Sequence, residues 1–542
     1  MSGILGFLGT AGVAAGCVLA SRTLTHYFQL ESYQFQGYFR ALKRSWKRLG
    51  RNGLVLAAPL IPLALLCGLI SGSAGRFLSG WPAANTWVCL ILGLTTAGLG
   101  WALRWWDSLR REKKPLVITP RVKRLTGIMA AVYLLLALLL RAIWPVWGLY
   151  LFPLLLPLWF AAAALAAWPV EKLINELYFR DAQKILASRP DLIRVGITGS
   201  YGKTSVKFIL GAMLSEKYQT LVTPASFNTP MGLTRVIRTQ LRPGHQVFVA
   251  EMGARHRGDI RELCRLVHPT YGLLTSVGPQ HLDTFRNIEN IRETKYDLIR
   301  ALPTDGCAFF PDDGGICAEL YDRTDKPKRL VSLNRGKAGH TPDVWAEGIR
   351  VSDRGSSFRL CTPSGSVACE TRLLGSHNIG NLLLAASAAL TMGVSLEQIR
   401  RAVRRLEPVE HRLQLLNQPG GITVIDDAFN SNPKSCMAAL EVLAGMGGRR
   451  ILITPGLVEL GEKEAEYNRS FGEAMKGCCD TVILVGEKHT APIREGLEKT
   501  GFDPAQIHVT ADLNAATALM RSIVRPGDTV MFENDLPDNY SE

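Results

Sequence analysis

The sequence predicts an α/β protein in which an N-terminal helical transmembrane domain precedes two α/β domains. Three observations support this fold class. Long apolar runs fill the first third of the chain. Short apolar strands alternate with amphipathic helices after about Asp191, and a glycine-containing loop joins the first strand to the next helix. With 542 residues, 47% hydrophobic and 20% charged, the chain is neither a disordered protein nor a disulfide-rich miniprotein.

The first element is a set of apolar runs long enough to cross a bilayer. A membrane-spanning helix needs ~20 mostly apolar residues. No basic residue precedes the first run, so we interpret it as a retained anchor rather than a signal peptide. The five predicted spans are Ile4–Ala20, Gly53–Gly72, Ala83–Leu103, Leu125–Trp144 and Val146–Val170.

The charge distribution predicts how these spans are oriented. Residues 1–170 carry 17 Lys and Arg against 3 Asp and Glu, whereas the rest of the chain is almost neutral and gives no support for nucleic-acid binding. The cations concentrate in loops 21–52 and 104–124, while the other two loops hold only Arg76 and Arg141. The positive-inside rule therefore predicts a multi-pass protein of the inner (cytoplasmic) membrane, with everything after residue 170 in the cytoplasm.

The two basic loops have two interpretations. They are topology signals alone, or their Trp46, Trp105 and Trp106 also meet anionic lipid headgroups or a lipid-linked phosphate substrate. The sequence favours the first interpretation and does not exclude the second.

The α/β region follows a predicted linker at 171–190. Alternation of strands and helices predicts a doubly wound, mainly parallel sheet over 191–406 and a second α/β domain over 407–542. A small antiparallel insert is expected between about Arg329 and Arg372. The predicted strands are Leu192–Thr198, Val247–Met252, Tyr271–Val277, Ile422–Ile425, Ile451–Thr454, Thr481–Val485 and Thr529–Phe532. Predicted helices include Thr204–Lys217, Asn378–Met392, Leu396–Leu406 and Lys434–Ala444.

The loop after the first strand reads Gly199-Ser-Tyr-Gly-Lys-Thr-Ser205. A loop of this kind before a helix presents backbone N–H groups to phosphate, with Lys203 on the outer phosphates and Thr204 on Mg²⁺. The motif is shorter than the common phosphate loop because Ile197 stands where the first glycine would be. A simple glycine turn is the alternative.

Three further polar residues follow later strands. Glu251 ends the second predicted strand, where a carboxylate next to a phosphate loop is well placed to bind Mg²⁺. A lone histidine such as His281 is more often a hydrogen-bonded structural residue. A lone lysine such as Lys295 is normally a solvated surface charge.

These residues belong to a longer series of motifs, and chance does not explain their occurrence together. In chain order, the motifs are TGSYGKTS at Thr198, FNTPMG at Phe227, EMGA at Glu251, HLD at His281, ETK at Glu293, GSHNIGN at Gly375, HRLQ at His411, DDAFNSNP at Asp426 and ELGE at Glu459. With this series the sequence resembles the Mur ligase family of ATP-dependent amide-bond ligases, and most of all its members that add D-alanyl-D-alanine. The resemblance implies a central phosphate-loop ATPase domain and a Rossmann-like C-terminal domain.

The resemblance also implies roles for individual residues. Nucleotide binding would use Gly199, Ser200, Tyr201, Gly202, Lys203, Thr204, Ser205, His377, Asn378, Asn381, Arg412 and Asp427. Two Mg²⁺ ions would be held by Thr204, Glu251, His281 and Lys295, the last as a carbamate. The catalytic residues would be Lys203, His281, Lys295 and Arg412, and the substrate would meet Asn228, Thr229, Phe429, Asn430 and Asn432.

The implied reaction joins two substrates in the cytoplasm. A carboxylate acceptor, linked to UDP or to a lipid, is phosphorylated by ATP, and an amino-acid or dipeptide amine then displaces the phosphate. Other partners would be ATP and the lipid bilayer, with no nucleic acid. Closure of the two α/β domains would complete the site.

The chain departs from the family pattern in three places. Membrane spans occupy the position of the domain that grips UDP, Phe429 replaces a usual tyrosine, and the C-terminus lacks the usual basic Lys-Gly-Ser-Arg ending. The alternatives are a ligase like the membrane-bound poly-γ-glutamate synthetases, an ATPase coupled to transport, and a scaffold without catalysis.

Overall fold

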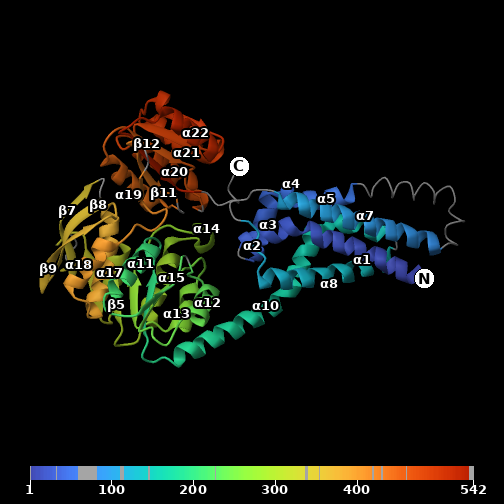
Figure 1. Cartoon of the computed structure of the whole chain (residues 1–542), viewed down its shortest axis with the longest axis horizontal. Helices are drawn as coiled ribbons and strands as arrows, with labels where there is room; N and C mark the ends of the chain where they lie inside the picture. Colours follow the sequence, from blue (N-terminus) through green and yellow to red (C-terminus); the bar gives the residue numbers. More distant parts are fainter. Residues whose placement is uncertain are drawn as a thin grey trace. The chain divides into compact units, whose positions relative to one another are not determined.

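The computed structural model describes residues 2–535 except 32, 59–81, 110–114, 145–146, 226, 336–339, 353–354, 418–419, 429–430 and 459. The chain divides into two compact units, unit 1 (Met1–Glu176) and unit 2 (Leu177–Leu536). Unit 1 is built of helices and unit 2 holds two β-sheets with their covering helices (Figure 1). The predicted order, helices first and α/β structure second, is therefore confirmed.

Unit 1 contains helices that could span a membrane by length and composition. Among the described residues these are Gly3–Ala20, Thr86–Ser108, Pro120–Ile143 and Gly148–Ala187. They coincide with four of the five predicted spans, whereas Gly53–Gly72 falls mostly outside the described residues. The helices are α1 (Ser2–Ala20), α2 (Arg22–Leu30), α3 (Phe35–Arg44), α4 (Trp46–Leu49), α5 (Arg51–Ala57), α7 (Pro82–Ser108), α8 (Pro120–Ile143), α9 (Trp147–Leu151), the 3-10 turn η1 (Phe152–Leu155) and α10 (Leu156–Ala187).

Helices α1 and α7 pack backbone against backbone. A Cβ atom on Gly9 would lie 2.2 Å from the carbonyl oxygen of Cys89, and one on Gly100 would lie 2.3 Å from that of Gly16. Such close approach needs residues without a side chain. Because the contacts advance in the same direction on both helices, α1 and α7 run parallel, as the predicted alternation of spans requires.

The two basic loops lie at one end of unit 1. The buried carboxylate of Asp107 accepts hydrogen bonds from Thr23 (2.6 Å) and Asn52 (3.1 Å) and pairs with Arg51 at 2.9 Å. Gln29 exchanges two hydrogen bonds with the backbone of Val117. These contacts join loop 21–52 to loop 104–124, so both are on the same side of any membrane that the unit crosses.

The last long helix continues past its predicted end. We expected a span to Val170 and a linker over 171–190, but α10 runs on to Ala187 with Pro169 inside it. The reason is a helical apolar stripe in that segment. Phe179, Ala182 and Leu186 recur at helical spacing and are buried in the core of unit 2.

The first sheet of unit 2 is doubly wound. Its strand order is β2-β3-β1-β4-β5-β6-β7-β8-β9, parallel from β2 to β7 and antiparallel from β7 to β9. The predicted antiparallel insert corresponds to the hairpins of β7, β8 and β9. The strands are β1 (Ile193–Thr198), β2 (Thr220–Val222), β3 (Val247–Glu251), β4 (Tyr271–Leu274), β5 (Cys307–Pro311), β6 (Lys328–Ser332), β7 (Val344–Ser352), β8 (Gly355–Thr362) and β9 (Gly365–Thr371).

Helices cover both faces of this sheet. One core contains α11 and α17 with α18, and the opposite core contains the end of α10 with α12, α13, α15 and α16. The helices are α11 (Lys203–Leu214), α12 (Pro230–Gln240), α13 (Asp259–Val267), α14 (Leu282–Phe285), α15 (Ile288–Ala301), α16 (Ile316–Asp322), α17 (Ser376–Thr391) and α18 (Leu396–Arg405). Because β3, β1 and β4 are neighbours, the loops at their carboxyl ends meet at one edge, where ligands bind in such folds.

The second sheet has the order β10-β11-β15-β12-β13-β14 and is parallel except for β10. Its strands are β10 (Gln414–Asn417), β11 (Thr423–Asp427), β12 (Arg450–Thr454), β13 (Thr481–Val485), β14 (Ile507–Thr510) and β15 (Thr529–Glu533). Its helices and 3-10 turns are α19 (Pro433–Ala444), η2 (Gly461–Lys463), α20 (Glu464–Ala474), α21 (Glu487–Lys499), η3 (Pro504–Gln506) and α22 (Leu513–Ile523). Helices α19, α20 and α21 cover one face and α22 the other.

Candidate active site

The glycine loop between β1 and α11 is held tightly against the neighbouring strand. Gly199 has a φ of +154°, and a Cβ atom there would lie 2.0 Å from the hydroxyl oxygen of Thr275. Ser200 is 2% exposed, and its hydroxyl donates to the carbonyl of Gly278 at 2.9 Å. The Tyr201 hydroxyl donates to the Pro279 carbonyl at 2.6 Å. These two side chains thus shape the loop and leave its backbone for a ligand.

The loop ends at the first turn of α11. Lys203 donates to the carbonyl oxygens of Gly199 (2.7 Å) and Ser200 (3.0 Å). Burial lowers the pKa of Lys203 to about 8, with Arg412 adding to the shift and Glu251 opposing it. A Cβ atom on Gly202, whose φ is +79°, would meet the side chain of Asn381 at 2.7 Å. A helix N-terminus with a lysine at its mouth attracts phosphate.

The carboxylate of Glu251 is the centre of a cluster of ion-pair and hydrogen-bond partners. It is 1% exposed and pairs with the buried ammonium of Lys207 at 2.9 Å. Asn228 donates to it at 3.0 Å, and the Thr204 hydroxyl lies 3.1 Å and 3.2 Å from its two oxygens. Burial alone would raise the pKa of Glu251, but Lys207 and Lys203 bring it below its usual value. The carboxylate is therefore charged before any ligand binds.

Lys207 is one of the residues that the sequence analysis missed. Besides Glu251 it contacts the carbonyl oxygen of Ala225, a non-glycine residue held at a φ of +42°. It thereby joins α11 to the segment that carries Asn228 and Thr229. A signal for it exists in the sequence, since Lys207 follows Lys203 by one helical turn inside an otherwise apolar stripe.

Lys295 and His281 lie on the helices that follow β4. Lys295 of α15 is 1% exposed, and burial followed by repulsion from Lys203 lowers its pKa well below the usual value. It is thus not the solvated surface charge that a lone lysine suggests. His281 has a φ of +52° and caps α14, where its carbonyl oxygen accepts from the backbone of Thr284 and Phe285 at 3.0 Å.

The residues present fit one magnesium position better than two. Mg²⁺ in nucleotide sites is held by one or two carboxylates together with phosphates and water, and the adjacent Thr204 and Glu251 offer this set. Among the described residues no three His, Cys, Asp or Glu side chains gather as a metal site. For the predicted second position, the anionic ligand would be a carbamate on Lys295.

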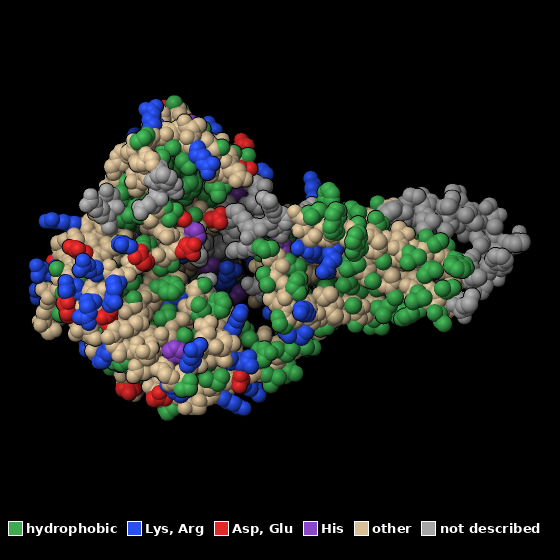
Figure 2. Space-filling model, viewed as in Figure 1, with side chains coloured by type: hydrophobic (Ala, Val, Ile, Leu, Met, Phe, Trp, Pro, Cys, Tyr) green, Lys and Arg blue, Asp and Glu red, His purple; other side chains and the backbone are tan. Residues whose placement is uncertain are grey.

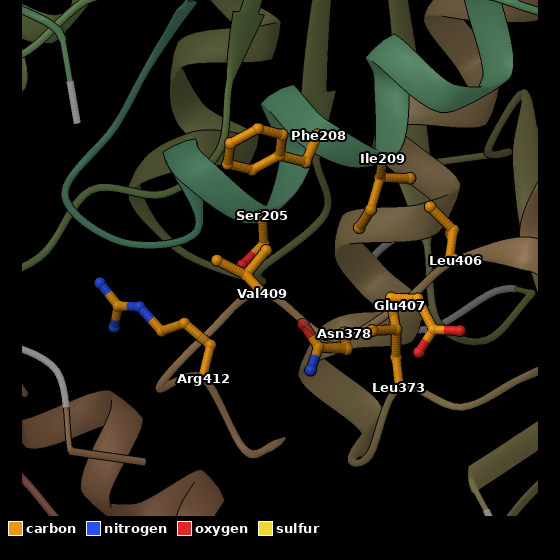
Figure 3. Close-up of a pocket in the computed structure, with 9 residues that line it drawn as sticks. All are labelled: Ser205, Phe208, Ile209, Leu373, Asn378, Leu406, Glu407, Val409 and Arg412. Atoms are coloured by element: carbon orange, nitrogen blue, oxygen red, sulfur yellow. The ribbon is translucent and has the colours of Figure 1, made fainter. Parts of the chain in front are cut away.

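A pocket opens beside the phosphate loop, with about 310 Å³ of empty space that includes open solvent at its mouth. It is mostly apolar, with a few polar groups, as small-molecule sites are. Figure 3 shows α11 on one side of it and the segment that leads into the second sheet on the other. The lining residues are Ser205, Phe208, Ile209, Leu373, Asn378, Leu406, Glu407, Val409 and Arg412.

The residues of α17 that were predicted to bind the nucleotide divide between this pocket and its supports. Asn378 lines the pocket and donates to the carbonyl of Leu374 at 2.9 Å. Asn381 donates to Asn378 at 3.3 Å. Burial, with the nearby cations Arg412 and Lys434, lowers the pKa of His377 to about 4, so its ring is neutral at pH 7.

Arg412 enters the site from a strained turn. The residues on either side, His411 and Leu413, have φ values of +59° and +44°, a conformation that costs ~1–3 kcal/mol for each non-glycine residue. The turn is fixed because Asp427 accepts from the backbone of Leu413 at 3.0 Å. Burial lowers the pKa of Arg412, while Asp427 and Glu251 oppose the change. The guanidinium is thus within electrostatic reach of both carboxylates.

Asp427 differs from Glu251 in its surroundings. Burial, followed by the nearby carboxylate of Glu533, raises the pKa of Asp427 to about 7, and Arg412 only partly opposes this. Glu533 is 0% exposed and accepts from Thr454 at 2.7 Å and from the thiol of Cys436 at 3.0 Å. The sequence analysis did not single out Glu533.

The predicted substrate residues are mostly helix caps. The Thr229 side chain accepts from Gly232 at the start of α12, and the Asn432 side chain accepts from Lys434 and Ser435 at the start of α19. Asn228 is bonded to Glu251, as described above. Phe429 and Asn430 lie outside the described residues.

Comparison with known proteins gives a consistent result. Residues 197–389 match the Mur ligase middle domain, and residues 411–533 match the Mur ligase, glutamate ligase domain. The chain is 34% identical over 363 residues to the UDP-N-acetylmuramoyl-tripeptide–D-alanyl-D-alanine ligase of Mycobacterium tuberculosis, covering 62% of this chain and 69% of that one. The enzyme of the same name from Escherichia coli is 30% identical over 339 residues, covering 61% and 74%.

Solved structures agree. MurF from Acinetobacter baumannii is similar with a TM-score of 0.60 and 25% identity, covering 68% of this chain and 78% of that one. Two others share the fold at lower identity. One, also from A. baumannii, is described as a UDP-N-acetylmuramoylalanyl-D-glutamyl-2,6-diaminopimelate–D-alanyl-D-alanyl ligase, with a TM-score of 0.59, 24% identity and coverage of 68% and 77%. The other is MurF from Thermotoga maritima in complex with ADP, with a TM-score of 0.59, 23% identity and coverage of 67% and 80%.

Proposed function

The chain is a MurF-like member of the Mur ligase family, whose members are ATP-dependent amide-bond ligases of peptidoglycan synthesis, and we propose that it works as a membrane-anchored ligase. The observation that carries this proposal is the prebuilt cluster around Glu251. It places one charged carboxylate, one hydroxyl and one lysine at the mouth of a phosphate loop. Phosphoryl transfer needs positioned charges of this kind more than covalent chemistry.

The residues act in two steps. The acceptor carboxylate attacks the γ-phosphate, so that a carboxyl O–P bond forms while the bond to ADP breaks. The amine then attacks the acyl carbon, loses a proton and releases inorganic phosphate. Lys203 exchanges its bonds to Gly199 and Ser200 for phosphate oxygens, and Arg412 offsets the same charge from the second sheet.

Magnesium would be held by Thr204 and Glu251, and a second ion by His281 and a carbamate on Lys295. Bound there, the metal would polarise the phosphoryl oxygens. The support for the carbamate is that Lys295 is 1% exposed beside Lys203, where an unmodified ammonium is expensive and an anion is favoured.

The nucleotide base would occupy the pocket in Figure 3, between Phe208 and Asn378, with Asp427 near the ribose. Asn381 and the neutral His377 would support it from α17. Asn228, Thr229 and Asn432, together with Phe429 and Asn430, would lie along the substrates.

The names of the relatives suggest the substrates. UDP-N-acetylmuramoyl-tripeptide would be the carboxylate acceptor and D-alanyl-D-alanine the amine donor. The match covers 69% of the M. tuberculosis ligase, and a lipid-linked acceptor therefore stays the alternative within the same chemistry. The comparisons favour this assignment over a ligase like the poly-γ-glutamate synthetases.

Unit 1 would hold the enzyme in the inner (cytoplasmic) membrane, with unit 2 in the cytoplasm. Of the 35 exposed large hydrophobic side chains in the described part of the chain, 28 belong to unit 1. Figure 2 shows hydrophobic side chains over unit 1, whereas charged side chains are interspersed on unit 2. Exposed tryptophans near the ends of the helices, such as Trp87 and Trp106, are typical of membrane interfaces.

Phosphate release by the detergent-purified full chain tests the proposal. With ATP and Mg²⁺, release should require both UDP-N-acetylmuramoyl-tripeptide and D-alanyl-D-alanine. Lys203→Ala should abolish it, whereas Lys499→Ala, which removes an exposed lysine of α21, should not. Ligation that persists in Lys203→Ala would refute the mechanism, and release only with a lipid-linked acceptor would change the substrate.

A further inference from the structure

Three arginines gather at the same edge of the first sheet as the Glu251 cluster. Arg255 and Arg257 lie in the loop between β3 and α13, and Arg286 follows α14; all three are exposed. The Thr284 hydroxyl, two residues before Arg286, donates to the carbonyl oxygen of Arg255. This bond brings the two segments together into one surface, the arginine rim, which consists of Arg255, Arg257 and Arg286.

The rim carries uncompensated charge. None of its three arginines forms an ion pair within the described part of the chain, whereas nearby arginines do. Arg261 pairs with Asp297 at 3.2 Å, and Arg323 pairs with Glu293 at 2.6 Å. The carboxylate of Asp259, at the end of the same loop region, accepts from the backbone N–H groups of Arg255 and His256 at 2.8 Å.

The backbone under the rim is strained. Helix α14 is only four residues long, and His281 and Arg286 at its two ends have φ values of +52° and +70°. Glycine would remove the strain of ~1–3 kcal/mol at each position. The chain keeps a histidine and an arginine there, which indicates that their side chains are needed.

The rim lies on the acceptor side of the site. The proposed nucleotide pocket is lined by residues of α11, of α17 and of the segment 406–412, and α11 and α17 share one face of the sheet. The rim lies in the loop before α13 and directly after α14, two helices of the core on the other face, where Asn228 and Thr229 directly precede α12. Arg255 follows Glu251 by four residues, which limits their Cα separation to about 14 Å.

We propose that the arginine rim binds the carboxylates of the acceptor peptide that do not react. This inference rests on the proposed function and adds to it the residues that recognise the acceptor. In a peptide that contains glutamyl and diaminopimelyl residues, each of these two residues has one carboxylate that takes no part in the amide bonds of the peptide chain. The planar guanidinium group binds a carboxylate through two parallel hydrogen bonds. Three such groups hold the peptide so that the reactive carboxylate faces the phosphate loop.

The test compares two acceptors that differ by one carboxylate, UDP-N-acetylmuramoyl-tripeptide with diaminopimelate or with lysine at its third position. The wild-type chain should prefer the diaminopimelate acceptor. The triple variant Arg255→Gln/Arg257→Gln/Arg286→Gln should raise the KM of that acceptor about 10- to 100-fold, with kcat and the KM of ATP unchanged, and should lose the preference. The control variant removes three exposed arginines elsewhere in unit 2: Arg350→Gln, Arg359→Gln and Arg404→Gln.

Several outcomes would overturn the inference: an unchanged acceptor KM in the triple variant, an equal loss in the control, or an unchanged preference between the two acceptors. If the increase in acceptor KM in the triple variant disappears when the diphosphate is removed from the acceptor, the rim binds phosphate and not the peptide carboxylates. If the wild-type chain ligates neither acceptor, the proposed function fails. Calorimetric binding of the diaminopimelate acceptor to both proteins then decides the inference alone, and equal or absent binding overturns it.

Discussion

In each sheet of unit 2, one parallel strand ends with a buried carboxylate, but the two carboxylates have opposite electrostatic surroundings. Glu251 of β3 faces the ammonium of Lys207, and its pKa is lowered. Asp427 of β11 lies beside Glu533, and its pKa is raised to about 7. The first sheet thus carries its own counter-ion before any ligand binds. The second depends on Arg412 from the connecting turn, so its half of the site is completed only when that turn is in place.

The largest effect should come from removing the counter-ion of Glu251. Lys207→Met leaves a buried carboxylate without its cation, which costs about 3–5 kcal/mol. Native-state hydrogen exchange of β3 and α11 in the full chain should show this loss of local stability. Lys499→Met is the matched control, since Lys499 is 69% exposed and should change exchange very little.

The double variant Lys207→Met/Glu251→Gln sharpens this prediction. Without the carboxylate there is no buried charge to compensate, so most of the lost stability should return. Equal exchange in the single and double variants would mean that packing of the lysine stem, and not the ion pair, stabilises this edge.

The sequence could predict the site around Glu251 in the first sheet better than the site around Asp427 in the second. The phosphate loop and Glu251 stand in local patterns, a glycine loop between strand and helix and an acid at a strand end. Lys207 was missed because its partner lies 44 positions away, and a lysine in a helix normally points to solvent. The pairing of Asp427 with Glu533 depends on the neighbouring positions of β11 and β15, which strand patterns alone do not specify.

The stability of the second sheet should fall as the pH rises, which is opposite to the response that the lowered pKa of Glu251 implies for the first sheet. Asp427 has a raised pKa, so the folded protein keeps a proton that the unfolded chain releases near pH 3.8. Stability of β11 should therefore fall as the pH rises from about 4 to about 7 and stay level above that. This fall amounts to at most about 4 kcal/mol, and Asp427→Asn should remove it.

Hydrogen exchange of β11 and β15 at pH 5 and pH 8, corrected for intrinsic rates, measures the difference. Wild type and Asp427→Asn should converge at low pH and separate at high pH, with the variant more stable. A variant that is less stable at pH 8 would show that folding lowers the pKa of Asp427 instead of raising it.

Arg412 links the two sheets, so its removal should affect catalysis more than folding. Arg412→Gln should lower kcat/KM by about 100-fold, because one charge-assisted contact to the phosphoryl group is lost. The measurement is phosphate release at saturating acceptor. Arg404→Gln, an exposed arginine of α18, is the control. An equal loss in both would refute a direct role for Arg412.

The smallest effect is expected at Glu533. Its carboxylate accepts from Thr454 and Cys436 and forms no ion pair with a lysine or arginine among the described residues, and burial raises its pKa. Glu533→Gln keeps an acceptor oxygen and removes only the charge, so stability at low pH should change by less than about 1 kcal/mol. As the pH rises above 4.5, wild type should lose stability relative to the variant. Exchange of β15 across this range measures the loss. If Glu533→Gln instead destabilises β15 as strongly as Lys207→Met destabilises β3, Glu533 is ionised and the two sheets do not differ in the way described here.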